Sequence, residues 1–122
     1  MANDFKRFVK KDIGTGEGAS GSTVYTVPSS SSTAMESIVI GITIANKSTA
    51  GITCDVFLDA LGGASDDVYI VKDASIPAGS SLEVMSGNKL VLQGDGTAND
   101  ALRISASAAT SLDATVSVLE DV

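Results

Sequence analysis

Residues 37–46 read SIVIGITIAN and residues 51–60 read GITCDVFLDA, and these two segments decide the predicted fold. In both, apolar side chains recur at every second position, which is typical of a strand with one buried face. Residues 46–51 between them are rich in turn formers, so we predict that the two segments form a β-hairpin. The residues assigned to the buried faces are Ile38, Ile40, Ile42 and Ile44 in the first segment and Ile52, Cys54, Val56, Leu58 and Ala60 in the second.

The same period of two continues through most of the 122 residues, and no window shows helical periodicity. Further strands are predicted at 22–28, 67–73, through Leu82 and Val84, and at 88–93, 101–107 and 112–120. The last two predicted strands bury Leu102, Ile104, Ala106, Leu112, Ala114, Val116 and Val118. Alternating faces need a second sheet to cover them. We therefore predict an all-β chain folded as a single antiparallel β-sandwich of about eight strands, with immunoglobulin-like and jelly-roll topologies both open.

The first 21 residues differ from the rest and predict a separate segment. Residues 5–13, FKRFVKKDI, suit either an edge strand or an extended tail. Residues 16–21 fit the G-x-G-x-x-G pattern, but the following segment alternates like a strand and stops at Pro28, whereas a dinucleotide site needs a helix there. The glycines instead favour a hinge. We thus predict a basic N-terminal arm with a Gly-rich hinge at 1–21 and a β-sandwich domain at 22–122.

Charge is unevenly distributed along the chain and indicates how it could meet a partner. The formal net charge is −7, yet residues 1–11 hold four basic residues and one acidic residue, and the remainder holds four basic and fourteen acidic residues. An acidic body repels a polyanion, so nucleic acid is not an expected partner. The basic start suits an acidic neighbour or the body of another copy. The predicted interface residues are Phe5, Lys6, Arg7, Phe8, Lys10, Lys11 and Phe57, since aromatic residues are favoured at subunit contacts.

The residue types present argue against catalysis and against a cofactor. The chain has no histidine, which excludes Ser-His-Asp and Cys-His arrangements and most zinc sites. Its one cysteine, Cys54, shares a face with Ile52 and Val56, so we interpret it as a core residue. We predict no catalytic residue, no cofactor, no metal and no small-molecule substrate. The turn at 94–100, GDGTAND, leaves one alternative open, a structural calcium at Asp95, Asn99 and Asp100.

Several stretches of the chain resemble small virion structural proteins of tailed bacteriophages, in particular those that infect marine bacteria. These stretches are the PAGSSL turn at 77–82, KLVLQGDG at 89–96, LRISASA at 102–108 and SLDATVSVLE at 111–120. The DIGT, VYTVP and IVIGITIAN segments of the first half fit the same pattern. The resemblance covers most of the chain and rests on turns and alternating strands.

This resemblance implies a non-enzymatic β-sandwich that packs against neighbouring virion proteins and further copies of itself. Capsid decoration, neck or collar, and tail accessory are the positions left open. No apolar run is long enough for a membrane span, and the first residues lack a signal-peptide pattern. We therefore expect synthesis in the bacterial cytoplasm and residence in the virion. The alternative is a carbohydrate- or receptor-binding module of a tail or fibre.

Overall fold

The computed structural model describes residues 3–16, 22–28, 34–59, 67–84, 89–96 and 98–121. The strands in these ranges are β1 (Asn3–Lys10), β2 (Ser22–Thr26), β3 (Met35–Asn46), β4 (Ile52–Asp59), β5 (Asp67–Ile76), β6 (Ser81–Glu83), β7 (Leu90–Gly94), β8 (Ala101–Ala106) and β9 (Leu112–Asp121). We find no helix in this part of the chain that is long and apolar enough to span a bilayer. The predicted all-β sandwich is confirmed.

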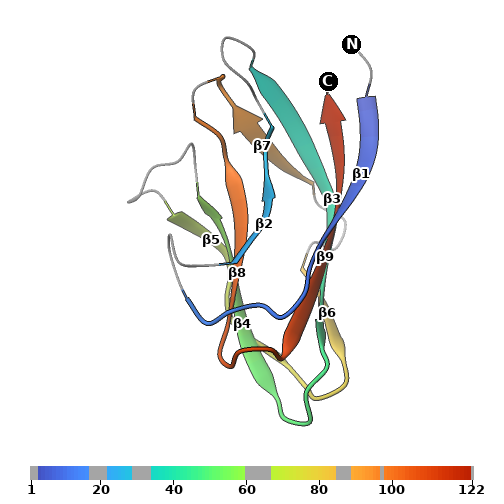
Figure 1. The fold of residues 1–122 in the computed structure, drawn as a ribbon, viewed down its shortest axis with the longest axis vertical. Helices are drawn as coiled ribbons and strands as arrows, with labels where there is room; N and C mark the ends of the chain where they lie inside the picture. The colour runs from blue at the N-terminus through green and yellow to red at the C-terminus, as the bar shows by residue number, and fades with distance from the viewer. Residues whose placement is uncertain are drawn as a thin grey trace.

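Two antiparallel sheets form the sandwich (Figure 1). One has the strand order β1-β9-β3-β6, with β7 also paired to β3, and the other has the order β2-β8-β4-β5. Early strands thus pair with late strands in reverse order: β1 pairs with β9, β2 with β8, β3 with β6 and β7, and β4 with β5. Successive pairs in this series lie alternately in one sheet and in the other. This is a long hairpin rolled into two layers, which defines the jelly-roll topology. The structure therefore decides the alternative that the sequence left open.

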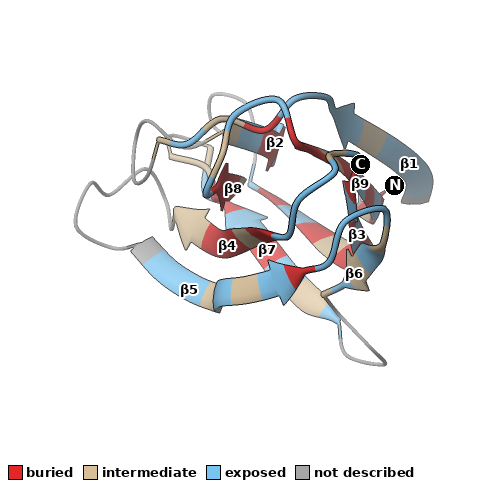
Figure 2. Cartoon of the chain, turned by 90° about the horizontal axis from the view of Figure 1, so that it is seen from below, coloured by how far each residue is buried: buried red, intermediate tan, exposed pale blue. Residues whose placement is uncertain are grey.

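The core lies between the two sheets, and the alternation of the sequence accounts for most of it. Figure 2 shows buried segments concentrated in the central strands and exposed ones along β1 and β5. Strands β4, β8 and β9 bury the residues predicted for them, with Leu58 partly buried and Ala60 outside the described residues. Because aromatic residues are few, branched aliphatic side chains fill the interior.

The predicted hairpin between β3 and β4 is wrong. Strand β3 pairs with β6, β7 and β9, whereas β4 pairs with β5 and β8 in the opposite sheet. The connector crosses from one sheet to the other, and Asn46 holds it in place by donating from Nδ2 to the carbonyls of Ala50 (2.8 Å) and Ile76 (2.9 Å). Two strands with alternating apolar residues and a short connector can form a hairpin in one sheet or can lie in opposite sheets, because each strand buries one face in either case.

A β-bulge in β3 changes which isoleucines are buried. Val39 pairs with Val118 and Gly41 pairs with Ser117, so Ile40 is an extra residue without a partner on β9. The bulge shifts the alternation by one position. Ile42 and Ile44 are fully buried as predicted, but Ile38 is only partly buried and Ile40 is 39% exposed, while Val39 takes the core position. The prediction that all four isoleucines share the buried face is therefore wrong for the first two.

The N-terminal segment is part of the sandwich. Residues 3–10 form β1, which pairs antiparallel with β9 along its whole length, from Asn3 opposite Asp121 to Lys10 opposite Ala114. Beyond it, Ile13 is fully buried and its N–H donates to the Leu112 carbonyl at 2.9 Å. Of the two forms predicted for this segment, the structure has the edge strand and not an arm that leaves the domain. The predicted hinge falls largely on residues 17–21, which lie outside the described residues.

Candidate functional site

Strand β1 presents an exposed, partly basic surface at one edge of the five-stranded sheet. Phe5 is 78% exposed and Val9 is 65% exposed, and Arg7 between them is also exposed. These three residues alternate with Lys6 and Phe8, which turn toward the core side of the strand. Of the residues predicted as an interface, Phe5 and Arg7 therefore lie on the outer face of the sheet.

Lys6 and Phe8 attach β1 to the interior. Lys6 Nζ lies 3.1 Å from Oε1 of Glu120, an ion pair in which the Glu120 side chain is 1% exposed. Oε2 of the same carboxylate accepts a 2.6 Å hydrogen bond from the Tyr25 hydroxyl, which also lies 2.7 Å from Ser37 Oγ. The Phe8 ring packs on the Tyr25 ring at a centroid distance of 4.7 Å. Burial, followed by the hydrogen bond to Glu120, raises the pKa of Tyr25.

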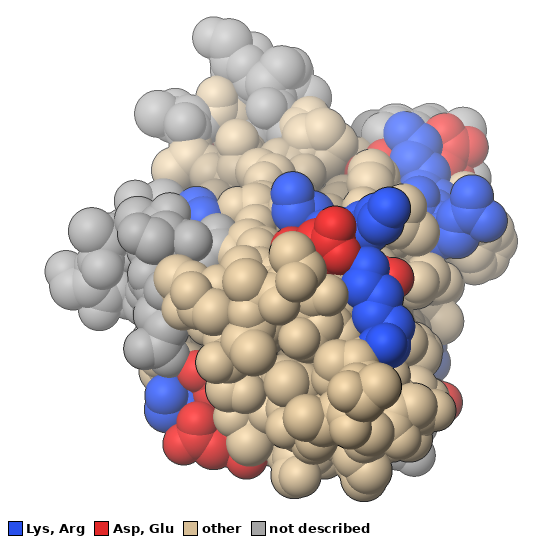
Figure 3. Space-filling model, turned by 60° about the horizontal axis from the view of Figure 1, so that its bottom comes forward, with Lys and Arg blue, Asp and Glu red and all other residues tan. Residues whose placement is uncertain are grey.

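Lys10 and Lys11 are exposed and continue the basic surface into the next turn. There Lys47 pairs with Asp12 and with Asp113, the latter at 3.0 Å, and the Asp12 N–H donates to Asp113 Oδ1 at 3.0 Å. The hydrogen bond from Asp12 and the ammonium of Lys47 lower the pKa of Asp113. Figure 3 shows several basic side chains toward the centre and upper right of this face, with acidic ones among them, and a broad surface without charged side chains below them.

Phe57 does not belong to this surface. It is fully buried, it lies in the four-stranded sheet, and its ring packs against Tyr69 of β5 at a centroid distance of 5.5 Å. The alternation of β4 predicted that Phe57 points away from the core between the sheets, and this is correct. Its side chain is nevertheless buried on the outer side of the sheet. The buried position of Phe57 does not suit the predicted interface role, and the structure does not bring it together with Phe5 or Phe8.

Four apolar side chains form a row across the outer face of the five-stranded sheet, and the sequence analysis missed three of them. Phe5 is opposite Leu119, Leu119 is opposite Ile38, and Ile38 is opposite Val91, so the row crosses β1, β9, β3 and β7 in register. We call Phe5, Leu119, Ile38 and Val91 the outer row. These residues could have been found in the sequence as apolar residues at strand positions that alternate with the buried ones, as Leu119 does with Val118.

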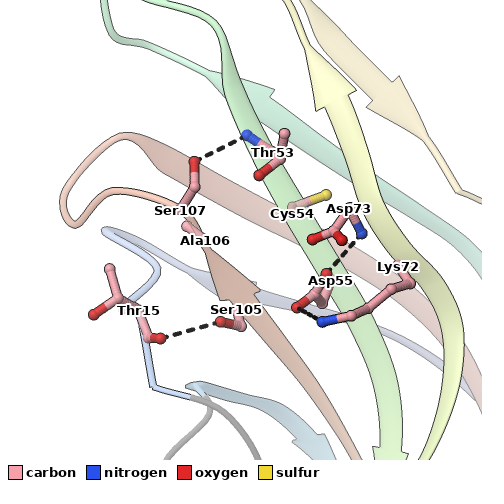
Figure 4. A pocket seen from close by; sticks show the side chains of 9 residues that line it. All are labelled: Thr15, Thr53, Cys54, Asp55, Lys72, Asp73, Ser105, Ala106 and Ser107. Atoms are coloured by element: carbon pink, nitrogen blue, oxygen red, sulfur yellow. Dashed lines mark hydrogen bonds and ion pairs between the residues drawn. The ribbon is translucent and has the colours of Figure 1, made fainter.

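A polar pocket of about 330 Å³ opens on the outer side of the four-stranded sheet (Figure 4). Asp55 is opposite Ser105 there, and both alternate with core residues. Oδ1 of Asp55 accepts the Asp73 N–H at 2.7 Å, and Oδ2 lies 3.2 Å from Lys72 Nζ. Asp73 has a left-handed backbone, φ 53°, because β5 bulges at this point. The lining, completed by Thr15, Thr53 and Ser107, suits a small ligand with several hydroxyl groups.

Cys54 also borders this pocket, yet its environment does not favour nucleophilic chemistry. Its side chain is buried, and burial together with the Asp55 charge raises the pKa of the thiol to about 11. The thiol is therefore protonated near neutral pH, the form that is a poor nucleophile.

In the acidic turn before β8, two carboxylates accept hydrogen bonds from nearby backbone N–H groups. Oδ1 of Asp95 accepts the Ala98 N–H at 2.7 Å, and Oδ2 of Asp100 accepts the Gln93 N–H at 2.8 Å. Across the described ranges, no three Asp, Glu, Cys or His side chains gather as a metal site would require. In the described residues, the Asp95 and Asp100 carboxylates therefore cap backbone N–H groups.

Comparison with known proteins supports the fold alone. No protein-family model matches the chain, and no curated protein matches it. Among solved structures, a chain from the crystal structure of the T13 IBDV viral particle is similar, with a TM-score of 0.51 and 12% sequence identity. The similarity covers 97% of this chain and 30% of that chain, so the present chain spans about a third of its length. The complete sandwich thus has the same fold as part of a viral-particle chain.

Proposed function

We propose that this protein is a non-enzymatic structural component of a virion, which packs against neighbouring virion proteins and stabilises the particle. The observation that carries the proposal is the outer surface of the five-stranded sheet, where the exposed apolar side chains of Phe5, Val9 and Val91 share one face with exposed Arg7. Apolar side chains rimmed by charge are typical of protein–protein contacts. The jelly-roll topology and the likeness of fold to part of a viral-particle chain support the same function.

The finer proposal is a tailed-phage virion, and it rests on the resemblance of the sequence. The partners would be capsid, neck or tail proteins, and the protein would act as a capsid decoration or as a neck, collar or tail accessory. It would be made in the bacterial cytoplasm and reside in the particle. Rigid binding surfaces suit this role, because β1 is held by Glu120 and Tyr25 and needs no ordering on contact.

Purified particles test the proposal. Mass spectrometry of gradient-purified virions should find this chain in many copies per particle, and antibody labelling should place it at regular positions. A lysate that contains the chain in quantity while the particles lack it would overturn the proposal. A charge-reversed variant, Arg7→Glu with Lys10→Glu, should enter particles less efficiently than Glu83→Lys, because Glu83 is exposed elsewhere on the same sheet.

A second candidate is a carbohydrate-binding module, and the polar pocket at Asp55 and Asp73 favours it. Its hydroxyl, carboxylate and ammonium groups match sugar hydroxyls, and Tyr69 lies beside it under Lys72, whose Nζ is 4.9 Å from the ring centroid. Titration with a panel of monosaccharides followed by NMR should then shift the amides of residues 53–55 and 72–73. Shifts spread evenly over the surface, or none at millimolar sugar, would dismiss this candidate.

A further inference from the structure

The outer row lies on the outer face of the sheet, with Phe5 and Val91 exposed and with Ile38 and Leu119 partly buried. Without the bulge at Ile40, the alternation of β3 would direct Ile38 to the core together with Ile42 and Ile44. The bulge instead turns Ile38 outward, directly between Leu119 and Val91, and leaves Ile40 39% exposed beside them. Bulges re-aim side chains. Here the result is an apolar band that reaches from the edge strand β1 to the edge strand β7.

The charges beside the outer row differ on its two sides. Two residues along the strands in one direction lies Glu36, which is exposed and pairs with Gln93. Two residues in the other direction lie Arg7 on β1 and Lys89, directly before β7, both exposed. At about 3.3 Å per residue, each charge is roughly 7 Å from the row. The band therefore has an acidic side and a basic side.

This asymmetry selects one arrangement for two such faces. If the two-fold axis runs parallel to the outer row, the acidic side of one copy faces the basic side of the other. Glu36 then lies about one strand spacing, roughly 4.8 Å in projection, from Lys89 of the second copy, within reach of both side chains. If the axis runs along the strands instead, Arg7 faces Lys89 of the other copy, which is repulsive.

We propose that two copies of this chain pack face to face through the outer row, related by a two-fold axis parallel to it, with Glu36 of each copy paired to Lys89 of the other. This names the self-contact within the proposed virion function and rests on that function only for its biological setting. The contact is isologous, so every interaction occurs twice.

The size of the face predicts a weak dimer in solution. Four strands at about 4.8 Å and about five residues at 3.3 Å cover roughly 20 by 17 Å. Such an area is at or below the lower limit for stable protein–protein interfaces, near 600 Å² per partner, and suits association in the micromolar range or weaker. Many copies held in one assembly would strengthen it through their high local concentration.

Sedimentation velocity of the full chain over a concentration series tests the proposal. We expect concentration-dependent dimers for the unchanged protein, and about tenfold or greater weakening for Glu36→Lys and for Lys89→Glu, since each places like charges together. The double variant, Glu36→Lys with Lys89→Glu, should recover dimerisation, because the pair is reversed and the net charge is restored. Val91→Lys should abolish the dimer, since it places a charge in the apolar band.

A matched control separates this contact from general charge effects. Glu83→Lys makes the same charge change as Glu36→Lys at an exposed position away from the outer row and should leave the dimer unchanged. A chain that stays monomeric at millimolar concentration, or a double variant as weak as the single ones, overturns the proposed dimer. A monomeric chain that is nevertheless abundant in particles would overturn this inference and leave the proposed function intact. A chain that dimerises as expected but is absent from particles would support this inference and overturn the proposed function.

Discussion

The Tyr25 hydroxyl donates a 2.6 Å hydrogen bond to Glu120, and this bond joins the two sheets inside the sandwich. Tyr25 belongs to β2 in the four-stranded sheet, and Glu120 belongs to β9 in the five-stranded sheet. Both side chains are buried, and Lys6 of β1 supplies the opposite charge at the edge. The cluster of Tyr25, Glu120 and Lys6 thus attaches β1 to the core and keeps the exposed face of β1 in a fixed position.

Replacing Tyr25 with Phe should lower the free energy of unfolding by about 2 kcal/mol, because Glu120 loses a donor inside the core. Chemical denaturation measures the change. Tyr69→Phe is the matched control, since Tyr69 is 43% exposed, and it should alter stability by less than about 0.5 kcal/mol. Equal effects of the two variants would contradict the role assigned to the Tyr25 hydroxyl.

Lys6→Met should cost about 1 kcal/mol of stability, a value reduced by the partial exposure of the lysine. Lys10→Met, which removes an exposed charge from the same strand, should be close to neutral. A double-mutant cycle with Glu120→Gln identifies the partner, because Lys6→Met should then lose most of its effect. If Lys6→Met costs the same in both backgrounds, the ion pair does not hold β1 in place.

Phe57→Ala should destabilise the fold by about 3–5 kcal/mol, as expected for a fully buried aromatic ring. Phe5→Ala should change stability by less than about 0.5 kcal/mol when measured at concentrations where the chain is monomeric. Urea titrations of the two variants compare them directly. A small effect at Phe57 would restore the original prediction that it is a contact residue.

Stability should decrease at alkaline pH because of Cys54. Its pKa is raised from 9.0 to about 11 in the fold, so between these values the unfolded thiol ionises while the folded thiol stays protonated. The stabilisation is complete below pH 9 and is lost as the pH rises to about 11, amounting to about 3 kcal/mol at 1.4 kcal/mol per unit. The raised pKa of Tyr25 acts in the same direction at higher pH.

Thermal melts between pH 8 and pH 11 measure this loss. Cys54→Val should flatten the decline in the lower part of the range, since it removes the thiol and keeps an apolar core side chain. An identical pH profile for Cys54→Val would assign the loss to other groups.

The alternation of apolar residues was sufficient to predict strands and their buried faces where the ladders are regular. Strand β9 is the clearest case, since Leu112, Ala114, Val116 and Val118 are all buried as predicted. The turn through Pro77 and Gly79 is another, because Gly79 takes a φ of 71° that glycine adopts at low cost. Such features depend on neighbours within a few residues, so local sequence contains the information.

The candidate site was only partly predictable. Phe5 and Arg7 were named as interface residues from the basic start of the chain and its aromatic residues, but the outer row depends on four strands that are far apart in the sequence. The alternation of β3 alone assigned Ile38 to the core, and only pairing with β9 shows the bulge that moves it outward. Phe57 was misassigned for a related reason, since its outer position is covered by contacts that no local pattern describes.

The sequence by itself determined an all-β chain, the location of most strands, the buried faces of β4, β8 and β9, and the uneven charge. Only the tertiary structure decided that β3 and β4 lie in different sheets, that residues 3–10 complete a sheet edge, and that the layers form a jelly roll. The physical reason is that a strand buries one face equally well beside many partners. Partner choice is decided by the summed packing of all strands around one core, a property of the whole chain.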